Sequence, residues 1–241
     1  LPSFSEAVAT LQMQEDFGAL TLTGAMAPPD EGMGEIWRAL MLGLRDYVNK
    51  NGFPGVVLGL SGGIDSAIVA ALAADALGPE AVHAVMMPSA YTSQESLDDA
   101  ADLAGRLGIR LDEISIAPAM QAMDGMLAEQ FAGTDPGIAE ENIQSRLRGI
   151  ILMGISNKSG PMVLATGNKS EYAAGYSTLY GDMCGGFAPI KDVWKVQVFD
   201  LCRWRNENMP RGGAGPSGEI IPTRIIEKPP SAELRPDQKD T

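Results

Sequence analysis

Apolar residues in this chain alternate between short continuous runs and longer stretches with helical spacing. Four runs that contain Val, Ile, Leu or Met lie near residues 56–60, 81–87, 109–116 and 161–166 and are expected to be strands, and the first two have the dense apolar composition of strands buried on both faces. Between them, apolar residues recur every three or four positions, as in 97–107, which is typical of amphipathic helices. Alternation of this kind predicts right-handed βαβ units. We therefore expect an α/β fold, a doubly wound parallel sheet with helices on both faces.

Two parts of the chain interrupt this alternation. Residues 1–33 carry little periodicity and end in Pro28-Pro29-Asp30-Glu31-Gly32, which predicts a linker or arm in front of a domain that covers 34–241. Residues 209–222 are rich in glycine and proline, and a Lys228-Pro229-Pro230-Ser231 turn follows them. Two prolines stiffen that turn, which suits either a lid over phosphates or a disordered tail.

Capping patterns and charges predict where two of the helices begin. Thr92 and Glu95 have capping-box spacing, so a helix is expected to start at Thr92. Lys191, Asp192 and Lys195 are expected to open a later helix. Because a cation at a helix start opposes the helix dipole, Lys195 is a candidate for binding an anion, with a solvated lysine as the alternative.

The composition narrows the class of protein. With 241 residues and 45% hydrophobic content, the chain allows one sizeable domain or two small ones. No stretch approaches the roughly 20 apolar residues of a membrane span, and the start lacks the features of a signal peptide, so we expect a soluble, cytoplasmic protein. Cys184 and Cys202 provide neither a disulfide framework nor a metal-ligand set. The first residue is Leu and not Met, which suggests a trimmed chain.

The formal net charge of −13 argues against nucleic acid and anionic membranes as partners. Binding to either is driven by a positive field, which an acidic chain does not generate. An anionic substrate would then have to be held by local lysines, arginines and a metal ion.

The first apolar run ends in a glycine-rich turn, Gly59-Leu60-Ser61-Gly62-Gly63-Ile64-Asp65-Ser66, which leads into an alanine-rich helix. The adjacent glycines allow a sharp turn and close approach of a ligand, while the serine hydroxyls and the free N–H groups of the helix start suit a phosphate. Asp65 would repel a phosphate unless a cation such as Mg²⁺ lies between them. The turn has neither Walker nor G-x-G-x-x-G spacing, so it indicates a metal–nucleotide site of another type, the alternative being an ordinary tight turn.

Polar residues follow the fourth apolar run in a similar way. Thr166 ends that run, and Glu171 lies at a predicted helix start directly after it. If this strand end lies beside the first turn, Thr166 lines the nucleotide pocket and Glu171 shares a magnesium ion with Asp65. Residues 173–189, which include Asp182, are too long and too rich in glycine for a plain connector, so we expect an active-site loop there.

One predicted helix carries candidates for a second ligand. Asn142, Arg146 and Gly149 are spaced i, i+4 and i+7, so that one helical face offers an amide, a guanidinium and a gap without a side chain. Such a face suits a flat, charged ligand, although a surface salt bridge is an equal alternative for Arg146. The methionine-rich helix predicted at 118–131 and the helix at 143–155 are candidates for core packing or for a homodimer face.

Five segments together carry a resemblance to a known family. They are Gly-Leu-Ser-Gly-Gly-Ile-Asp-Ser (59–66), Glu-Asn-Ile-Gln-Ser-Arg (141–146), Ala-Thr-Gly-Asn-Lys-Ser-Glu (165–171), Thr-Leu-Tyr-Gly-Asp-Met-Cys-Gly-Gly (178–186) and Lys-Pro-Pro-Ser-Ala-Glu-Leu (228–234). The first resembles the pyrophosphate loop of the N-type ATP pyrophosphatases. The later four resemble NAD synthetase, specifically the synthetase half of its glutamine-dependent, two-domain form, and imply an adenine nucleotide alpha hydrolase-like fold.

The resemblance implies an ATP-dependent amidation. The carboxylate of nicotinic acid adenine dinucleotide would attack the α phosphate of ATP, pyrophosphate would leave, and ammonia would displace AMP to give NAD. The residues implied to bind ATP are those of the 59–66 turn with Thr166, Lys195 and Ser231, and Mg²⁺ would be bound by Asp65 and Glu171. The implied catalytic residues are Asp65, Lys195 and Lys228, and the implied dinucleotide contacts are Asn142, Arg146, Glu171 and Asp182.

The chain also departs from that family pattern. Nothing in it resembles the Cys, Glu and Lys triad of a glutaminase domain, so we expect free ammonia as the nitrogen source unless such a domain was cut away or lies in another chain. The family continues past the 228–234 motif, which suggests truncation at the C-terminus. The resemblance implies a homodimer or higher homo-oligomer. Two alternative hypotheses for the function are another N-type ATP pyrophosphatase amidotransferase and a non-catalytic adenine-nucleotide sensor.

Overall fold

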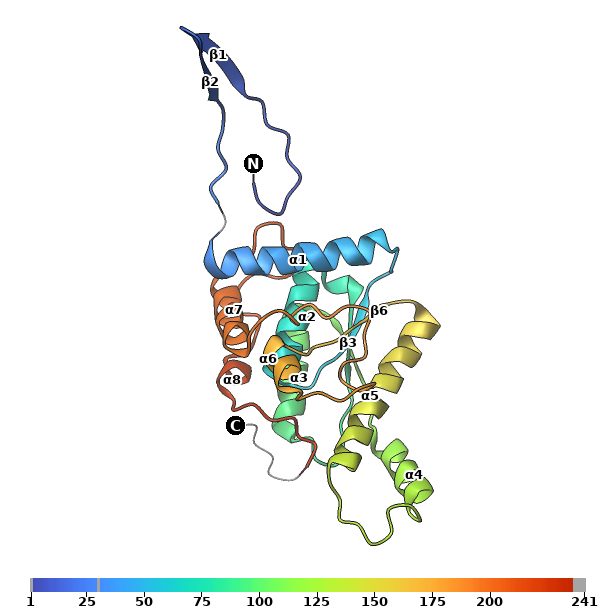
Figure 1. The fold of residues 1–241 in the computed structure, drawn as a ribbon. Coiled ribbons are helices and arrows are strands. Elements are labelled where there is room, and N and C mark those ends of the chain that lie inside the picture. Colours follow the sequence, from blue (N-terminus) through green and yellow to red (C-terminus); the bar gives the residue numbers. More distant parts are fainter. Residues whose placement is uncertain (1, 30, 236–241) are drawn as a thin grey trace.

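A four-stranded parallel sheet forms the centre of the protein in the computed structural model, which describes residues 2–29 and 31–235 (Figure 1). Its strand order is β5-β4-β3-β6, from β5 (Arg110–Glu113), β4 (Val82–Met86), β3 (Val56–Gly59) and β6 (Met162–Leu164). Val56 of β3 pairs in parallel with Val82 of β4 and with Met162 of β6. The carboxyl ends of all four strands therefore lie at the same edge of the sheet, as the predicted α/β fold requires.

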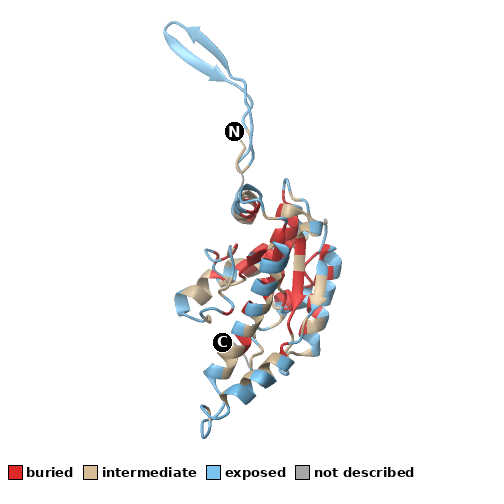
Figure 2. Ribbon diagram, turned by 90° about the vertical axis from the view of Figure 1, so that its right-hand side faces the viewer, coloured by how far each residue is buried: buried red, intermediate tan, exposed pale blue. Residues whose placement is uncertain are grey.

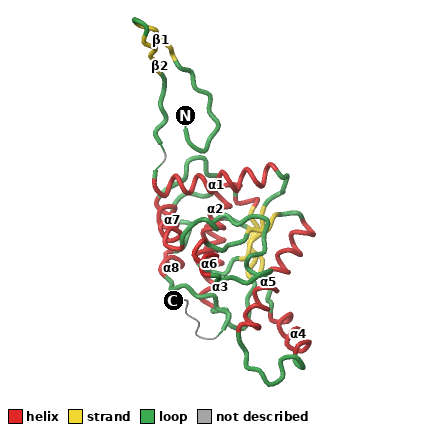
Figure 3. The backbone as a smooth tube through the Cα atoms, viewed as in Figure 1, coloured by secondary structure: helices red, strands yellow, loops and turns green. Residues whose placement is uncertain are grey.

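Helices cover both faces of this sheet (Figure 3). One face packs into a large apolar cluster with residues of α1 (Gly32–Lys50), α2 (Ile64–Leu77), α3 (Gln94–Leu107), α7 (Lys195–Glu207) and α8 (Thr223–Glu227). The other face forms a smaller cluster with α4 (Ala117–Leu127) and α5 (Ile138–Ser159). Two short elements, the 3₁₀ turn η1 (Pro79–Ala81) and α6 (Lys169–Ala174), complete the domain. The predicted doubly wound arrangement is confirmed.

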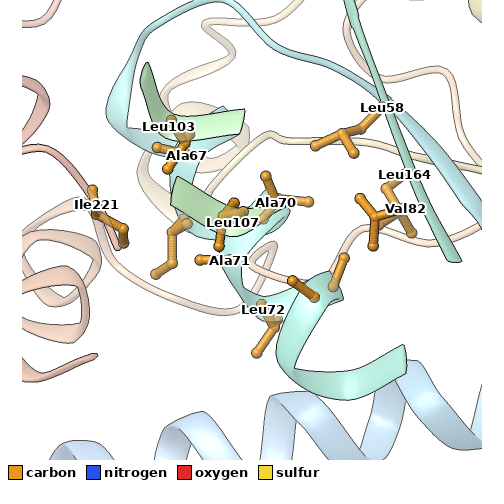
Figure 4. Close-up of a cluster of buried hydrophobic side chains, with 14 of the residues drawn as sticks. Leu58, Ala67, Ala70, Ala71, Leu72, Val82, Leu103, Leu107, Leu164 and Ile221 are labelled. Atoms are coloured by element: carbon orange, nitrogen blue, oxygen red, sulfur yellow. The ribbon is translucent and has the colours of Figure 1, made fainter. Parts of the chain in front are cut away.

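The central helix α2 is enclosed by other elements on every side. Its residues from Ala67 to Ala74 are all fully buried, between the sheet and the helices α1, α3 and α7 (Figure 4). Small alanine side chains allow these neighbours to approach closely, which an ordinary amphipathic helix would not. The helix start that follows the glycine-rich turn is therefore set on a rigid element.

A buried ion pair joins α2 to its neighbours. Arg205 of α7 donates two hydrogen bonds to the carboxylate of Asp75, at 2.6 and 2.8 Å, and both side chains are fully buried. The indole N–H of Trp37 in α1 donates a third, at 2.9 Å. Since each charged group has partners, the pair satisfies the condition for ions inside a core.

The N-terminal residues, predicted as a linker or arm, contain a hairpin that was not expected from the sequence. Two antiparallel strands, β1 (Gln12–Asp16) and β2 (Ala19–Thr23), form a hairpin whose residues are all exposed and which projects from the domain (Figures 1 and 2). Its turn, Phe17-Gly18, has positive φ at both positions, 48° and 83°, which matches the twist of a two-residue hairpin. Five-residue strands without a buried face carry too weak a pattern to be recognised from sequence.

Two predicted helix starts are wrong by a few residues. Ser93, and not Thr92, is the N-cap of α3, because its hydroxyl accepts a hydrogen bond from the Ser96 N–H at 3.2 Å. The helix expected to open at Lys191 begins at Lys195. Among the described residues, no helix combines the length and the apolar character needed to cross a membrane.

Candidate nucleotide site

The glycine-rich turn connects β3 to α2, and its serines hold it in shape. Ser66 Oγ donates to the Gly63 carbonyl oxygen at 3.0 Å and accepts from the Ser61 N–H at 3.2 Å. The two serine hydroxyls lie 3.1 Å apart, and Ser61 Oγ also accepts from the Gly63 N–H at 3.3 Å. Gly63 is the N-cap of α2, so the positive end of that helix faces the turn.

Glycine is required at position 62 for two reasons. Its φ of +78° lies in the left-handed region, and a Cβ there would lie 2.3 Å from the Ser96 carbonyl oxygen of α3. The turn therefore rests directly on the first turn of α3. The side chains of Leu60 and Ile64 are buried in the core, so these two predicted ATP contacts have only backbone groups to offer.

Asp65 lies among polar groups from two other elements. Its Oδ1 accepts a hydrogen bond from Nδ2 of Asn168 at 2.9 Å, and its Oδ2 pairs with the ammonium of Lys195. Asn168 is the N-cap of α6 and follows β6, as does Thr166. Since β6 is the direct neighbour of β3, the predicted meeting of these two strand ends is confirmed.

Glu171 completes this acidic group. Its carboxylate accepts a hydrogen bond from the Asn168 N–H at 2.9 Å as part of a capping box at the start of α6. Burial, and then the nearby charge of Asp65, raise the pKa of Glu171 to about 7, with a smaller contribution from Asp182. Asp65 and Asp182 thus both disfavour the charged form of Glu171, and the nearby ammonium of Lys195 offsets part of their effect.

The residues around Asp65 are suited to Mg²⁺. The described residues contain no cluster of three or more His, Cys, Asp or Glu side chains that would hold a metal ion by themselves. Mg²⁺, however, is usually bound by one or two carboxylates together with substrate phosphates. Asp65 and Glu171, whose like charges interact beside the glycine-rich turn, fit that donor set.

A second group of predicted residues gathers where α5 meets the loop of residues 173–189. Asn142 Oδ1 accepts a hydrogen bond from Thr178 Oγ1 at 2.7 Å, and Arg146 Nε donates to the Leu179 carbonyl at 3.2 Å. The Asp182 carboxylate accepts from the Thr178 N–H at 2.7 Å, and burial raises its pKa. These residues hold the loop against the helix, and the interpretation of Arg146 as a surface salt-bridge residue is replaced by a contact with a carbonyl.

The gap expected at Gly149 is filled by the loop. A Cβ there would lie 3.1 Å from the Gly181 carbonyl oxygen and 3.2 Å from that of Tyr180. The missing side chain therefore admits protein backbone, which corrects the idea of an open slot for a flat ligand. Arg148 does not belong to this group: its Nε donates to the Met87 carbonyl at 3.1 Å, and burial lowers its pKa to about 10.

Lys228 and Ser231 belong to the segment that follows α8. The ammonium of Lys228 donates to Ser96 Oγ at 2.6 Å, and Ser96 is the residue that supports Gly62 of the glycine-rich turn. This segment is therefore packed beside the candidate phosphate site, and the disordered-tail alternative does not hold for residues 228–235. The end of the predicted domain beyond residue 235 lies outside the described residues.

Sequence reasoning missed two residues that organise the site. Asn168, fully buried, caps α6 and orients Asp65. Ser96 connects the glycine-rich turn to Lys228. A helix-start signal was present for Asn168, since Glu171 follows it three residues later, but no local signal reveals what Ser96 contacts across 132 positions.

The domain combines parallel strands, a glycine-rich turn at the start of a buried helix, and acidic groups at the same edge of the sheet. This combination defines an α/β nucleotide-binding domain of the adenine nucleotide alpha hydrolase type. Within that class, the chain belongs to the NAD synthase family, whose model matches residues 36–241. The resemblance found in the five sequence segments is confirmed at the level of the family.

Known proteins support this assignment along most of the chain. The chain is 58% identical to a glutamine-dependent NAD(+) synthetase of Rhodobacter capsulatus, over 100% of its own length and 44% of that relative. Among solved structures, it is similar to a glutamine-dependent NAD⁺ synthetase of Acinetobacter baumannii in complex with ADP, with a TM-score of 0.83, 44% identity and coverage of 93% of this chain and 41% of that one. An NMN synthetase of Francisella tularensis has a TM-score of 0.74, 32% identity and coverage of 88% and 80%. The chain spans less than half the length of the curated relatives it matches.

Proposed function

We propose that this domain converts nicotinic acid adenine dinucleotide to NAD, using ATP and ammonia and releasing AMP and pyrophosphate. The observation that carries the proposal is the convergence of Asp65, Glu171 and Lys195 beside the Ser61–Ser66 turn. Membership of the NAD synthase family supports the choice of acceptor. The acidic net charge of −13 supports a small-molecule substrate over a tRNA.

In this proposal, the backbone of the 59–66 turn, with Thr166 and Ser231, binds the ATP phosphates and nucleoside. The Asp65 carboxylate pairs with Lys195 in the structure described above, so both groups would have to change partner when substrate binds. Lys195, once released from Asp65, would contact a phosphate oxygen of the leaving pyrophosphate. Lys228, which contacts Ser96 beside Gly62 of the turn, would neutralise the same developing charge.

Mg²⁺ bound by Asp65 and Glu171 would neutralise phosphate charge and orient the phosphates for attack. Asn142, Arg146 and Asp182 are proposed to contact the dinucleotide. They also hold the adjoining loop in place. The 228–234 segment is proposed to cover the phosphates and to exclude water, which would otherwise hydrolyse the acyl-adenylate.

Free ammonia is proposed as the nitrogen source for this chain, and a glutaminase domain as a partner that delivers it. The similar proteins of greater length are named glutamine-dependent, which supports that partner. We also propose a cytoplasmic location, consistent with the two free cysteines Cys184 and Cys202, and a homo-oligomer. Exposed Ile150 and Met153 on α5 support the helix as part of its interface, and analytical ultracentrifugation tests the assembly.

The function is tested by incubating the chain with ATP, Mg²⁺ and ammonium, offering one acceptor at a time. Pyrophosphate release and product mass are followed for nicotinic acid adenine dinucleotide, nicotinic acid mononucleotide, aspartate and xanthosine monophosphate. We expect release that depends on the dinucleotide and yields NAD. Release with the mononucleotide alone would favour the activity for which the Francisella protein is named.

Two other outcomes would replace the proposal. Release that depends on aspartate or on xanthosine monophosphate would indicate another amidotransferase of the pyrophosphatase class. Binding of ATP without release for any acceptor would indicate a nucleotide sensor. An Asp65→Asn variant measured in parallel shows whether any release originates in this site.

A further inference from the structure

We propose that Glu233 is a positioning residue, which holds the Lys228–Ser231 turn against the phosphate site. The inference rests on the proposed function, because it explains how a lysine expected to contact ATP is kept in place. Glu233 is not one of the residues for which the sequence motifs implied a role in binding or catalysis. Its side chain faces inward, toward the start of α3.

Three hydrogen bonds converge on the Glu233 carboxylate. It accepts from the Ser93 N–H at 3.1 Å, from Ser93 Oγ at 2.8 Å and from Ser96 Oγ at 2.8 Å. Ser93 is the N-cap of α3, so the negative charge lies at the positive end of a 14-residue helix. The carboxylate therefore attaches the C-terminal segment to an element about 140 positions away in sequence.

The same group of residues reaches both Lys228 and the glycine-rich turn. Lys228 Nζ lies 3.7 Å from Glu233 Oε1 and donates to Ser96 Oγ at 2.6 Å. The Ser96 carbonyl oxygen occupies the space that a side chain at Gly62 would need. Glu233 thus fixes the position of the ammonium and of the helix turn on which the phosphate-binding backbone rests.

The backbone at Glu233 indicates that the segment is held by these contacts. Its φ of 49° lies in the left-handed region, which residues with a side chain rarely adopt. Such a conformation persists where surrounding contacts enforce it. On either side, the Glu233 N–H donates to Ser231 Oγ at 3.3 Å, and Gln144 of α5 donates to the Leu234 carbonyl at 2.8 Å.

Binding of an ATP analogue tests the proposal without requiring catalysis. Calorimetry with Mg²⁺ and α,β-methylene-ATP, which cannot be cleaved between its α and β phosphates, compares the 241-residue chain with its Glu233→Ala and Glu233→Gln variants. We expect the dissociation constant to rise by about tenfold to a hundredfold for Ala, about the effect of losing one hydrogen bond to a charged group. Glu227→Gln, which removes an exposed carboxylate six positions earlier, is the matched control and should bind as the parent chain does.

A double-mutant cycle distinguishes a positioning role from general support of the fold. If Glu233 acts through Lys228, Glu233→Ala should add less than about threefold to the loss in a Lys228→Ala background. In steady-state kinetics, KM for ATP should rise while KM for the dinucleotide stays constant, and Glu233→Asp should restore part of the loss. Loss through misfolding would change both KM values and the melting temperature.

Two results would overturn the inference. One is a dissociation constant of Glu233→Ala within twofold of the parent chain, and the other is full additivity with Lys228→Ala. Both are separate from failure of the proposed function, in which the parent chain binds the analogue but forms no NAD. If Glu233→Ala does not fold, Glu233→Gln, which keeps the size of the side chain, carries the same comparison.

Discussion

Asp65 is held from two sides, by the amide of Asn168 and the ammonium of Lys195. Removing its charge should therefore affect chemistry far more than folding. For Asp65→Asn we expect pyrophosphate release to fall by at least about a hundredfold, because loss of one charge-stabilising group has an effect of this size. Its melting temperature should stay within a few degrees of that of the parent chain. A coupled pyrophosphate assay and a thermal melt measure the two effects.

Asp46→Asn is the matched control for that change. Asp46 also pairs with a lysine, Lys50, but on the exposed surface of α1. It should leave both activity and stability nearly unchanged. Near-normal turnover of Asp65→Asn would refute the role assigned to Asp65 in binding the metal ion.

Glu171 makes the stability of the metal-free protein depend on pH. Its pKa of about 7 in the folded protein is above the ordinary value of 4.5, so between these values the folded state holds a proton that the unfolded state has lost. Stability must then fall as pH rises through this window, and the penalty stays constant above it. Glu171→Gln removes the penalty and keeps an acceptor for the Asn168 N–H.

We therefore compare the melting temperatures of Glu171→Gln and the parent chain in buffer with a chelator. The variant's advantage over the parent should be larger at pH 8 than at pH 5. Differential scanning fluorimetry at both pH values provides the measurement. The exposed Glu129→Gln should show no such change in the difference. An equal difference at both pH values would contradict the raised pKa.

At the scale of elements, α5 carries a built-in comparison between two glycines. A Cβ at Gly149 would lie within 3.4 Å of three atoms of the loop of residues 173–189, whereas a Cβ at Gly154 would have no atom within 4 Å. Gly154→Ala should stabilise the helix, by up to about 1 kcal/mol, because alanine is the better helix former. Gly149→Ala should instead displace residues 178–184.

We expect Gly149→Ala to raise KM for the dinucleotide severalfold or more, while Gly154→Ala leaves it unchanged. Steady-state kinetics and chemical denaturation of the two variants check this. If both variants behave alike, the close packing of α5 against the loop does not matter for substrate binding. The comparison is sharp because both changes add the same methyl group to the same helix.

The elements were predictable to different degrees, for physical reasons. The runs that became β3, β4 and β6 are continuous because both faces of those strands are buried, and this pattern survives in a single sequence. The hairpin β1–β2 has no buried face, so its sequence carries little signal. The start of α3 moved from Thr92 to Ser93 because several nearby hydroxyls could cap the helix, and the geometry of the preceding turn selects one.

For the whole molecule, the contrast between the exposed hairpin and the buried domain predicts a simple proteolytic pattern. Phe17 is fully exposed at the tip of the hairpin, while the apolar face of α1 lies in the core. Limited chymotrypsin digestion should cut after Phe17, Leu20 or Leu22. The resistant fragment should then begin in the arm and retain the domain from residue 34. Mass spectrometry identifies the fragment.

Thermal unfolding of that fragment tests whether the arm contributes to the domain. We expect a melting temperature within a few degrees of the intact chain, because the hairpin strands contribute nothing to either described apolar cluster. Early cleavage inside residues 34–235 would contradict the proposed division into an arm at 1–33 and a domain at 34–241.

The sequence by itself determined the class of fold, the glycine-rich turn and the implication of a cation at Asp65. These follow from local properties: the periodicity of apolar residues, the conformational range of glycine, and the repulsion between a carboxylate and a phosphate. Only the tertiary structure decided which distant groups surround that turn. Asn168 contacts Asp65 across 103 positions, and Glu233 contacts Ser96, on which Gly62 rests, across 137 positions. Such pairings leave no periodic trace in one chain.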